Sequence, residues 1–259
     1  MRVTDSMISR QILRNLNKTS SNILRNQEKL SSGQRITRPS DEPVGIVEML
    51  SYRKEIAELG EYKKTMEGSI EWMQATSTVL TSVEDTLFEI RDIAEQADSG
   101  LMTEEQHTAM AHMVDEYLKE LIDLSNSENR ERALFGGAQT LSQPFTAVYT
   151  GDQITAVTQN PDGIDGEQIR EIGSGQSIVI NAKGGELFQP GGAGAAGDVF
   201  QVVINIRDAL ASHDLTALDG ELTAIGDIEN RFTEANSIVG SKITRVEFSV
   251  DRNELLSLD

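Results

Sequence analysis

The glycine-rich segment from Gly192 to Gly197 is the strongest candidate for a cofactor site in this sequence. It matches the spacing G-x-G-x-x-G and comes just before a predicted helix. A dinucleotide-binding loop requires a buried strand that ends directly at the first glycine, within a βαβ unit. Here Pro190 and Gly191 precede the motif, and proline does not end such a strand. We therefore predict an ordinary loop and no cofactor, because an oxidoreductase function would depend on this motif alone.

The remaining residues with metal-binding or catalytic chemistry do not form a recognisable site. Asp162 and Asp165 stand on a predicted turn, but the late bidentate glutamate of a calcium loop is missing. His107 and His112 are five residues apart on a predicted helix, so they do not share a face as metal ligands would. His213 stands alone near a helix end, where the helix dipole is a sufficient explanation. No nucleophile-and-base arrangement is recognisable either. We predict no metal site, no catalytic residues and a protein that is not an enzyme.

The charge of the chain is distributed unevenly. The 259 residues carry a net charge of -19, yet residues 1–38 carry +6, so the remainder carries -25. An acidic body disfavours nucleic acid and anionic membranes as partners. The basic arm has no aromatic residues between its cations on which bases could stack. We predict that neither nucleic acid nor a membrane is a partner.

The first 38 residues have the pattern of a helix that needs a partner. The three-and-four spacing of a coiled-coil seam joins Leu13, Leu16, Ser20, Ile23, Gln27 and Leu30, and Gly33 suits the position after a helix end. Two seam positions are polar, and isolated helices of this kind are marginal in water. We therefore expect residues 1–36 to be mobile in the monomer and to become helical when neighbouring molecules bury the seam.

Long helices are predicted for the next hundred residues. Thr37–Pro43 is a predicted loop, with Ser40 or Asp41 as the helix cap, and no proline follows Pro43 until residue 144. A helix over 42–98 would extend about 85 Å, with possible bends at Gly60 and Gly68. Ser99-Gly100 ends it, and the capping box Thr103–Gln106 begins an antiparallel neighbour.

A β-rich segment then interrupts the helical pattern. Alternating and β-branched runs at 145–149, 153–158 and 176–181 predict strands, with turns at Gly151-Asp152 and Lys183–Gly185. A helix returns at Asp198, and the last helix repeats apolar residues every seven positions. The predicted fold is α+β and mainly α: an elongated rod of long antiparallel helices with coiled-coil-like terminal segments. The predicted parts are a basic N-terminal arm and loop over 1–41, a helical rod over 42–141 plus 198–259, and a β-rich outer domain with the glycine loop over 142–197.

Two short segments carry a resemblance to a known family. Leu30-Ser31-Ser32-Gly33-Gln34-Arg35-Ile36, followed by Pro39-Ser40-Asp41-Glu42-Pro43-Val44-Gly45, resembles the N-terminal signature of the bacterial flagellin superfamily. The form with Pro-Ser-Asp and a second proline is more similar to its hook-associated junction proteins than to filament flagellin. Leu134-Phe135-Gly136-Gly137 and Val239–Glu247 extend the resemblance over nearly the whole chain.

The resemblance implies a structural subunit of the flagellum, an adaptor ring at the hook–filament junction that assembles through its terminal helices. Its implied partners are further copies of itself, the other hook-associated junction protein, flagellin and a flagellar export chaperone. It would leave the cell unfolded through the flagellar type III apparatus, since no cleavable signal is recognisable, and family members usually carry a further C-terminal stretch. Filament flagellin and a soluble coiled-coil binding module remain alternatives. We assign the assembly interface to residues of both seams: Leu13, Leu16, Ile23, Leu30, Arg35, Ile225, Phe232, Val239 and Val246.

Overall fold

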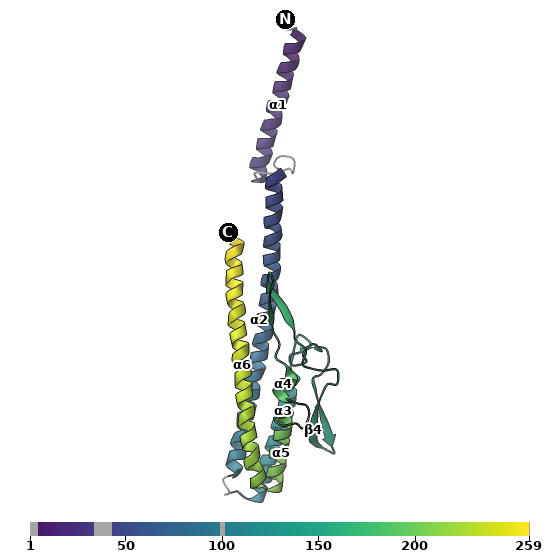
Figure 1. Ribbon diagram of the computed structural model, residues 1–259, viewed down its shortest axis with the longest axis vertical. Helices are drawn as coiled ribbons and strands as arrows, with labels where there is room; N and C mark the ends of the chain where they lie inside the picture. The colour runs from purple at the N-terminus through teal and green to yellow at the C-terminus, as the bar shows by residue number, and fades with distance from the viewer. Residues whose placement is uncertain (1–4, 34–42, 99–101, 259) are drawn as a thin grey trace. The chain divides into compact units, whose positions relative to one another are not determined.

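The fold was analysed in a computed structural model, which describes residues 5–33, 43–98 and 102–258 (Figure 1). The chain divides into two compact units, Met1–Glu58 and Leu59–Asp259. We refer to them as unit 1 and unit 2.

Unit 1 consists of one helix and the beginning of a second. Helix α1 spans Asp5–Ser32, and Gly33 follows it with a φ of +68°, as expected for the residue after a helix end. Helix α2 begins at Pro43, where the missing N–H of proline removes no hydrogen bond. The predicted caps Ser40 and Asp41 lie outside the described residues. The predicted N-terminal helix and its end are therefore confirmed.

Helix α2 is continuous over Pro43–Asp98, which confirms the prediction of one long helix. Gly60 and Gly68 do not interrupt it, because strong helix formers surround both. Buried side chains begin only at Met66 and continue to Ala97. The second half of α2 therefore belongs to the core of unit 2.

Helix α3 spans Glu104–Ser125 and starts with the predicted capping box. The backbone N–H of Gln106 donates to Oγ1 of Thr103 over 3.4 Å, and the backbone N–H of Thr103 donates to Oε1 of Gln106 over 2.9 Å. The two bonds satisfy N–H groups that the first helical turn leaves without partners. The predicted stop at Ser99-Gly100 lies outside the described part of the chain.

The long helices α2 and α6 run antiparallel in unit 2. Helix α5 spans Val199–Ser212, where a helix was predicted to return at Asp198, and Asp198 is its N-cap; α6 spans Leu215–Leu258. Polar pairs join α2 to α6 along their length, and the α6 residue number falls as the α2 number rises. These pairs are Lys63 with Glu254, Ser77 with Asn236, and Arg91 with Glu229.

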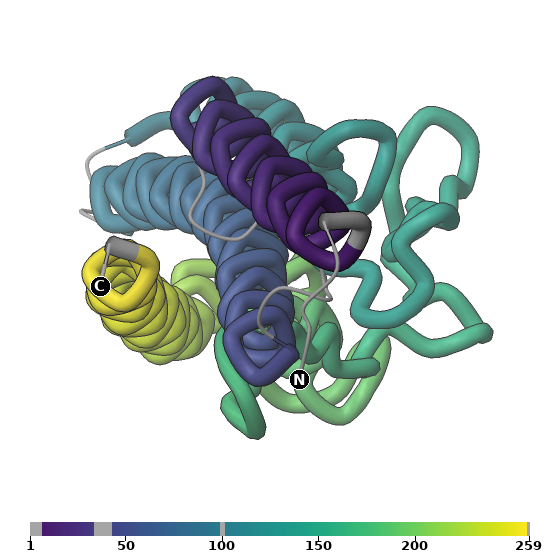
Figure 2. The backbone as a smooth tube through the Cα atoms, turned by 90° about the horizontal axis from the view of Figure 1, so that it is seen from above, coloured from purple at the N-terminus to yellow at the C-terminus, as the bar shows by residue number. Residues whose placement is uncertain are grey.

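Three two-stranded antiparallel hairpins accompany the helices. Figure 2 shows the backbone of the hairpin segment, in teal, to one side of the helices of unit 2. Strand β5 and the pair β1–β2 were not predicted, and Lys183–Gly185 is not a turn but the start of the short helix α4. The elements are β1 (Glu128–Asn129), β2 (Arg132–Ala133), β3 (Phe145–Thr150), β4 (Gln153–Gln159), β5 (Ile169–Gly173), β6 (Gln176–Val179) and α4 (Gly184–Phe188).

A cluster of phenylalanines ties the hairpins to the helices. The ring centroid of Phe188 in α4 lies 5.1 Å from those of Phe135 and Phe232, and 5.3 Å from that of Phe145. Edge-to-face pairs at such distances add to the stabilisation that burial itself provides. The rings thus join β3, α4 and α6 in one core. The mainly α fold with long antiparallel helices and a small β insertion is confirmed, while the predicted domain boundaries stay a prediction.

Arg207 adds a buried polar link between the elements of unit 2. Its side chain is nearly inaccessible, and Nη1 donates to Oδ1 of Asp115 over 3.0 Å and to the carbonyl of Ile154 over 2.8 Å. Burial favours the protonated form of Asp115, but Lys119 and Arg207 outweigh it and lower the pKa of the carboxyl. Arg207 therefore connects α5 with α3 and β4.

Candidate assembly surface

The apolar stripe of α1 is exposed in the part of the chain that the structure describes. Leu13, Leu16, Ile23 and Leu30 are all exposed, and Leu30 keeps 84% of its surface. Their spacings of three, seven and seven residues place them along one side of the helix. A row of large exposed side chains is typical of a helix that packs against another molecule.

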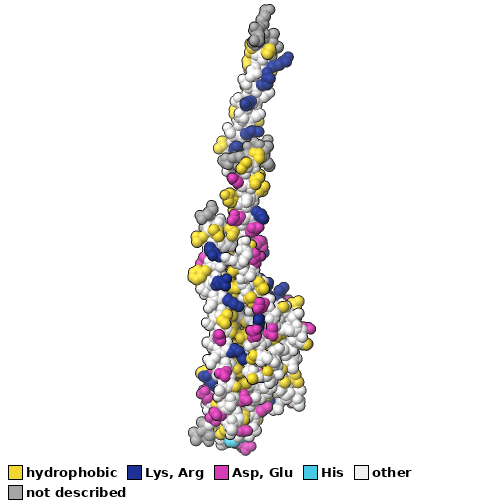
Figure 3. Space-filling model, viewed as in Figure 1, with side chains coloured by type: hydrophobic (Ala, Val, Ile, Leu, Met, Phe, Trp, Pro, Cys, Tyr) yellow, Lys and Arg dark blue, Asp and Glu magenta, His cyan; other side chains and the backbone are white. Residues whose placement is uncertain are grey.

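The basic residues of α1 lie opposite this stripe. At about 100° per residue, Arg14, Lys18 and Arg25 fall on the side of the helix away from Leu16 and Ile23. Figure 3 shows side chains of both kinds along α1. The charges therefore leave the stripe free for apolar contact, and they keep the helix soluble.

The first turns of α2 carry further exposed apolar side chains, which were not predicted from the sequence. Val44, Val47, Leu50 and Ile56 are exposed by half or more of their surface. They are three, three and six residues apart in a helix whose buried positions begin only at Met66. The sequence showed these apolar residues, but only the structure shows that they are exposed among the described residues.

The seam of α6, in contrast to that of α1, is buried. Ile225, Phe232, Val239 and Val246 are all buried, with Phe232 and Val246 at 0% exposure. They belong to the same hydrophobic core as α2, α3 and α5. The structure therefore gives these four predicted interface residues partners within their own chain. Of the predicted interface, the exposed part is on α1, and Arg35 lies outside the described residues.

The glycine-rich loop is organised by the N-cap carboxylate of α5. Oδ2 of Asp198 accepts from the backbone N–H of Gly194 over 2.7 Å and from Nε2 of Gln189 over 2.9 Å. Burial raises the pKa of Asp198, and these donors oppose the shift. The loop follows α4 rather than a strand, so its glycines serve a capping turn and not a dinucleotide.

The structure brings two of the three histidines together. His107 is buried, and its ring centroid lies 4.3 Å from that of His213, the αL residue that ends α5. Neither ring nitrogen of His107 has a hydrogen-bond partner. Burial, and to a lesser degree His213, lower the pKa of His107. Sequence spacing could not show this contact, because the two residues are on different helices.

The other candidate residues form no site. The backbone N–H of Asp162 donates to Oδ1 of Asn160 over 3.0 Å, which is an ordinary polar turn. Within 5–33, 43–98 and 102–258, no three His, Asp or Glu side chains are placed to hold a metal ion. Over the same residues, no helix is both long enough and apolar enough to cross a membrane.

Comparisons with known proteins agree on one family. Residues 3–146 match the family model of the bacterial flagellin N-terminal helical region. The chain is 26% identical over 226 residues to the flagellar filament 30.7 kDa core protein of Treponema maltophilum, covering 83% of this chain and 72% of that protein. It is 21% identical over 266 residues to flagellar hook-associated protein 3 of Escherichia coli K12, covering all of this chain and 82% of that protein.

A solved structure shows the same fold. The flagellar junction protein FlgL from Legionella pneumophila superimposes with a TM-score of 0.66 at 13% sequence identity. The match covers 84% of this chain and 98% of that one. At such low identity the likeness concerns the arrangement of helices and hairpins.

Proposed function

The chain belongs to the bacterial flagellin family, and we propose that it is the junction subunit of the flagellum, an adaptor ring between hook and filament. It is a structural component of the flagellum and not an enzyme. The full-length likeness to hook-associated protein 3 and to a FlgL junction protein supports the junction over the filament. The observation that carries the assembly mechanism is the exposed apolar stripe of α1.

The stripe explains why assembly and ordering of α1 are coupled. Each buried leucine or isoleucine contributes roughly 1.5–3 kcal/mol, whereas fixing the backbone costs about 1–2 kcal/mol per residue. A few such contacts do not order 28 residues unless the helical hydrogen bonds and intersubunit packing form together. In the free subunit α1 is therefore marginal, and in the ring it is packed against terminal helices of its neighbours.

This coupling suits a subunit that travels before it assembles. A chain that leaves the cell unfolded through the flagellar export apparatus must not polymerise early, and a helix that forms only beside its neighbours meets that need. The partners at the junction are further copies of the chain, the second hook-associated junction protein and flagellin, with an export chaperone before secretion. The family resemblance at Leu30–Ile36 and Pro39–Gly45 supports this set of partners.

Deletion of the gene in the motile bacterium that carries it tests the junction role. We expect cells that retain hooks but shed flagellin into the medium, because the adaptor is missing. Filaments of normal length and number on the deletion strain would contradict the role.

Point variants then test the stripe. In the complemented strain, Leu16→Asp with Ile23→Asp places two charges on the stripe and should abolish filament attachment. The matched control is Asn15→Asp with Asn22→Asp, which adds the same charge to exposed positions beside the stripe. Equal loss of attachment in the two variants would argue against the stripe, since charge alone would then be responsible.

Filament flagellin is the alternative that shares this fold. The likeness to a filament core protein supports it, although that match covers less of the chain than the match to hook-associated protein 3. Long polymers formed by the purified chain would favour the filament, and a chain that stays monomeric alone favours the junction. A stable dimer in solution would instead favour a soluble coiled-coil binding module.

A further inference from the structure

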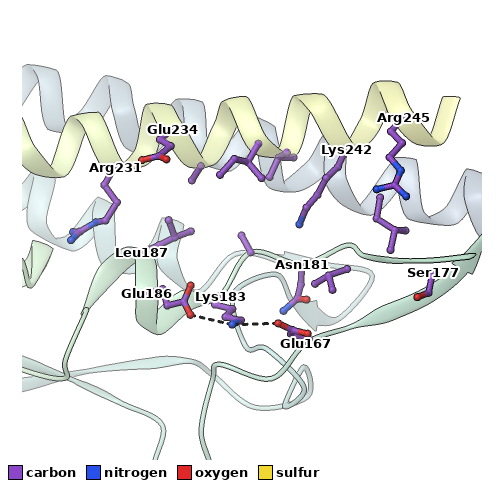
Figure 4. Close-up of a pocket in the computed structure, with 16 residues that line it drawn as sticks. Glu167, Ser177, Asn181, Lys183, Glu186, Leu187, Arg231, Glu234, Lys242 and Arg245 are labelled. Carbon is purple, nitrogen blue, oxygen red and sulfur yellow. Dashed lines mark hydrogen bonds and ion pairs between the residues drawn. The ribbon is translucent and has the colours of Figure 1, made fainter. Parts of the chain in front are cut away.

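Unit 2 contains a groove that its own chain leaves open. It lies between α6 and the segment formed by β6 and α4, and its volume is about 600 Å³ (Figure 4). Apolar side chains form its walls: Ile178 from β6, Leu187 from α4, and Ile238 and Val239 from α6. This size and composition are typical of a site that receives a large side chain or a small ligand.

Cations without carboxylate partners line the α6 side of the groove. Lys183 on the opposite side is neutralised by Glu167 at 3.4 Å and Glu186 at 3.1 Å. Lys242 and Arg245 make no hydrogen bond or ion pair with any residue that the structure describes. Burial lowers the pKa of Lys242, since desolvation disfavours its charged form, and the charge of Glu167 opposes the shift without outweighing it. A carboxylate of an occupant beside Lys242 would favour the charged form of Lys242 again.

Arg231 continues this row of cations towards the glycine loop. Its Nη2 donates to the carbonyl of Gly197 over 2.8 Å, while Nε is buried without an acceptor. Glu234 is the one acidic residue among the α6 residues of the groove. The α6 wall therefore has an excess of positive charge.

This concentration of cations is unusual for the chain. In the described part of unit 2, seven Lys or Arg side chains have no carboxylate within 4.0 Å, and five of them lie on α6 or β5. Figure 3 shows Lys and Arg side chains gathered on this face. Since residues 39–259 carry a net charge of -25, two copies repel each other over most surfaces. The groove is therefore the part of unit 2 that best accommodates acidic side chains of a neighbouring copy. The five cations on α6 or β5 without a carboxylate within 4.0 Å are Arg170, Arg231, Lys242, Arg245 and Arg252, and the other two of the seven are Lys64 and Arg132.

The chain also carries a surface with the complementary chemistry. Phe88 on α2 is 54% exposed, although aromatic rings of this size are usually covered. Asp85 and Asp92, three residues before and four after it, lie on the same side of the helix and are exposed, as is Glu89. Arg91 lies over the Phe88 ring, with its Cζ 5.3 Å from the ring centroid, and is itself paired with Glu95 and Glu229. We call Asp85, Phe88, Glu89 and Asp92 the acidic knob.

The acidic knob and the groove face different directions. Two residues of α6, Glu229 and Asn236, contact α2. Each is followed two residues later by a groove residue, Glu229 by Arg231 and Asn236 by Ile238. Two residues correspond to about 200° around a helix, so the groove opens on the side of α6 away from α2. The two surfaces are therefore presented for contact between copies. A contact between two different patches repeats head to tail, and it closes into a ring when the rotation permits.

We propose that the groove receives Phe88 of a second copy of this chain, with Asp85 and Asp92 of that copy beside Lys242 and Arg245. The proposal rests on the ring assembly of the proposed function and adds a contact in unit 2 to those of the terminal helices. Phe88 enters between Leu187 and Ile238, and the carboxylates neutralise cations that form no ion pair with the described residues of their own chain.

Disulfide trapping in assembled particles tests the contact, because the chain contains no cysteine of its own. Asp92→Cys with Ile238→Cys places one thiol in the knob and one at the groove. After mild oxidation of hook–junction–filament particles from the complemented deletion strain, we expect a ladder of covalent oligomers at multiples of the chain's mass. Adding Phe88→Ala should lower the yield about tenfold, as for an aromatic anchor at an interface centre.

The matched control moves one thiol by a single residue. Ser237 is exposed and lies about 100° around α6 from Ile238, so Asp92→Cys with Ser237→Cys should give no ladder. Attached filaments without a ladder, or equal ladders from both pairs, would overturn the contact while the junction role stands. A cross-link to a protein of different mass would overturn the choice of occupant. Normal filaments on the deletion strain itself would overturn the junction role instead.

Discussion

Helices α1 and α6 carry the same apolar pattern but use it differently. Leu16 and Ile23 on α1 are seven residues apart and exposed, whereas Phe232 and Val239 on α6 are seven residues apart and buried. The α6 seam packs into a core that includes α2, α3 and α5. The α1 seam is exposed among the described residues, so we infer that sister subunits complete it.

The difference shows that a heptad pattern predicts that a helix face packs against another helix, but not whether that helix belongs to the same chain. What distinguishes the two seams is their composition. Positions 20 and 27 of the α1 seam are Ser and Gln, which a coiled coil tolerates only at a cost in stability. The α6 seam is apolar at each repeat and includes an aromatic residue that joins the phenylalanine cluster. A diluted seam suits contacts that must wait for assembly, and an undiluted seam suits a core.

The largest expected effect separates the two seams directly. Phe232→Ala should lower the free energy of unfolding of the free chain by about 3–5 kcal/mol, because it opens a cavity among packed rings. Leu16→Ala should change it by less than about 0.5 kcal/mol, since the side chain is already in water. Urea unfolding followed by circular dichroism measures both. Similar losses in the two variants would mean that α1 is packed in the free chain.

The polar contacts should follow the same division between core and surface. Arg207→Met should cost about 2 kcal/mol, since Asp115 keeps Lys119 but the carbonyl of Ile154 loses its donor. Arg130→Met removes an exposed pair with Glu71 and should cost less than about 1 kcal/mol. Denaturation midpoints of the two variants check this, and a reversed order would contradict the role of Arg207.

A smaller effect should appear when the pH is lowered. The pKa of buried His107 lies below that of the unfolded chain, so between these values the unfolded state binds more protons. Stability should therefore fall as the pH drops below about 6.5, by at most about 1.4 kcal/mol per pH unit. His107→Phe should remove this slope, whereas replacement of exposed His112 by Gln should leave it. An unchanged slope in His107→Phe would assign it to other groups.

The smallest predicted effect concerns the start of α3. Thr103→Ala removes the side-chain acceptor of the capping box and should cost about 1 kcal/mol. Thr108→Ala is the control, because its hydroxyl donates only to the carbonyl of Glu104 within the same helix. Thermal unfolding of the two variants distinguishes them, and equal midpoints would show that the cap is dispensable.

Local signals predicted the helices of this chain well. Pro43, the box at Thr103 and Asp198 each begin a helix where expected, because caps and prolines act on adjacent backbone groups. Strand β5 was not predicted, because Ile172 is its one buried side chain and its alternation of apolar and polar residues is therefore weak. Helix α4 was not predicted, because two of its five residues are glycine, which indicates a turn rather than a helix.

The candidate site was predicted only in part for a different reason. Periodicity marks a face as apolar, but whether the chain itself covers that face depends on contacts distant in sequence. The α6 seam and the first turns of α2 show this in opposite directions, since one is covered and the other is not. The groove beside Lys242 and Arg245 was also invisible, because its other wall is about sixty residues earlier in the chain.

Amide hydrogen exchange along α1 and α6 tests the central claim most directly. In the free chain, amides of Arg10–Leu30 should exchange nearly as fast as in an unstructured peptide, while those around Phe232 and Val239 should be among the slowest. In isolated junction particles the α1 amides should become protected as well. Strong protection of Arg10–Leu30 in the free monomer would contradict the claim that sister subunits complete this helix.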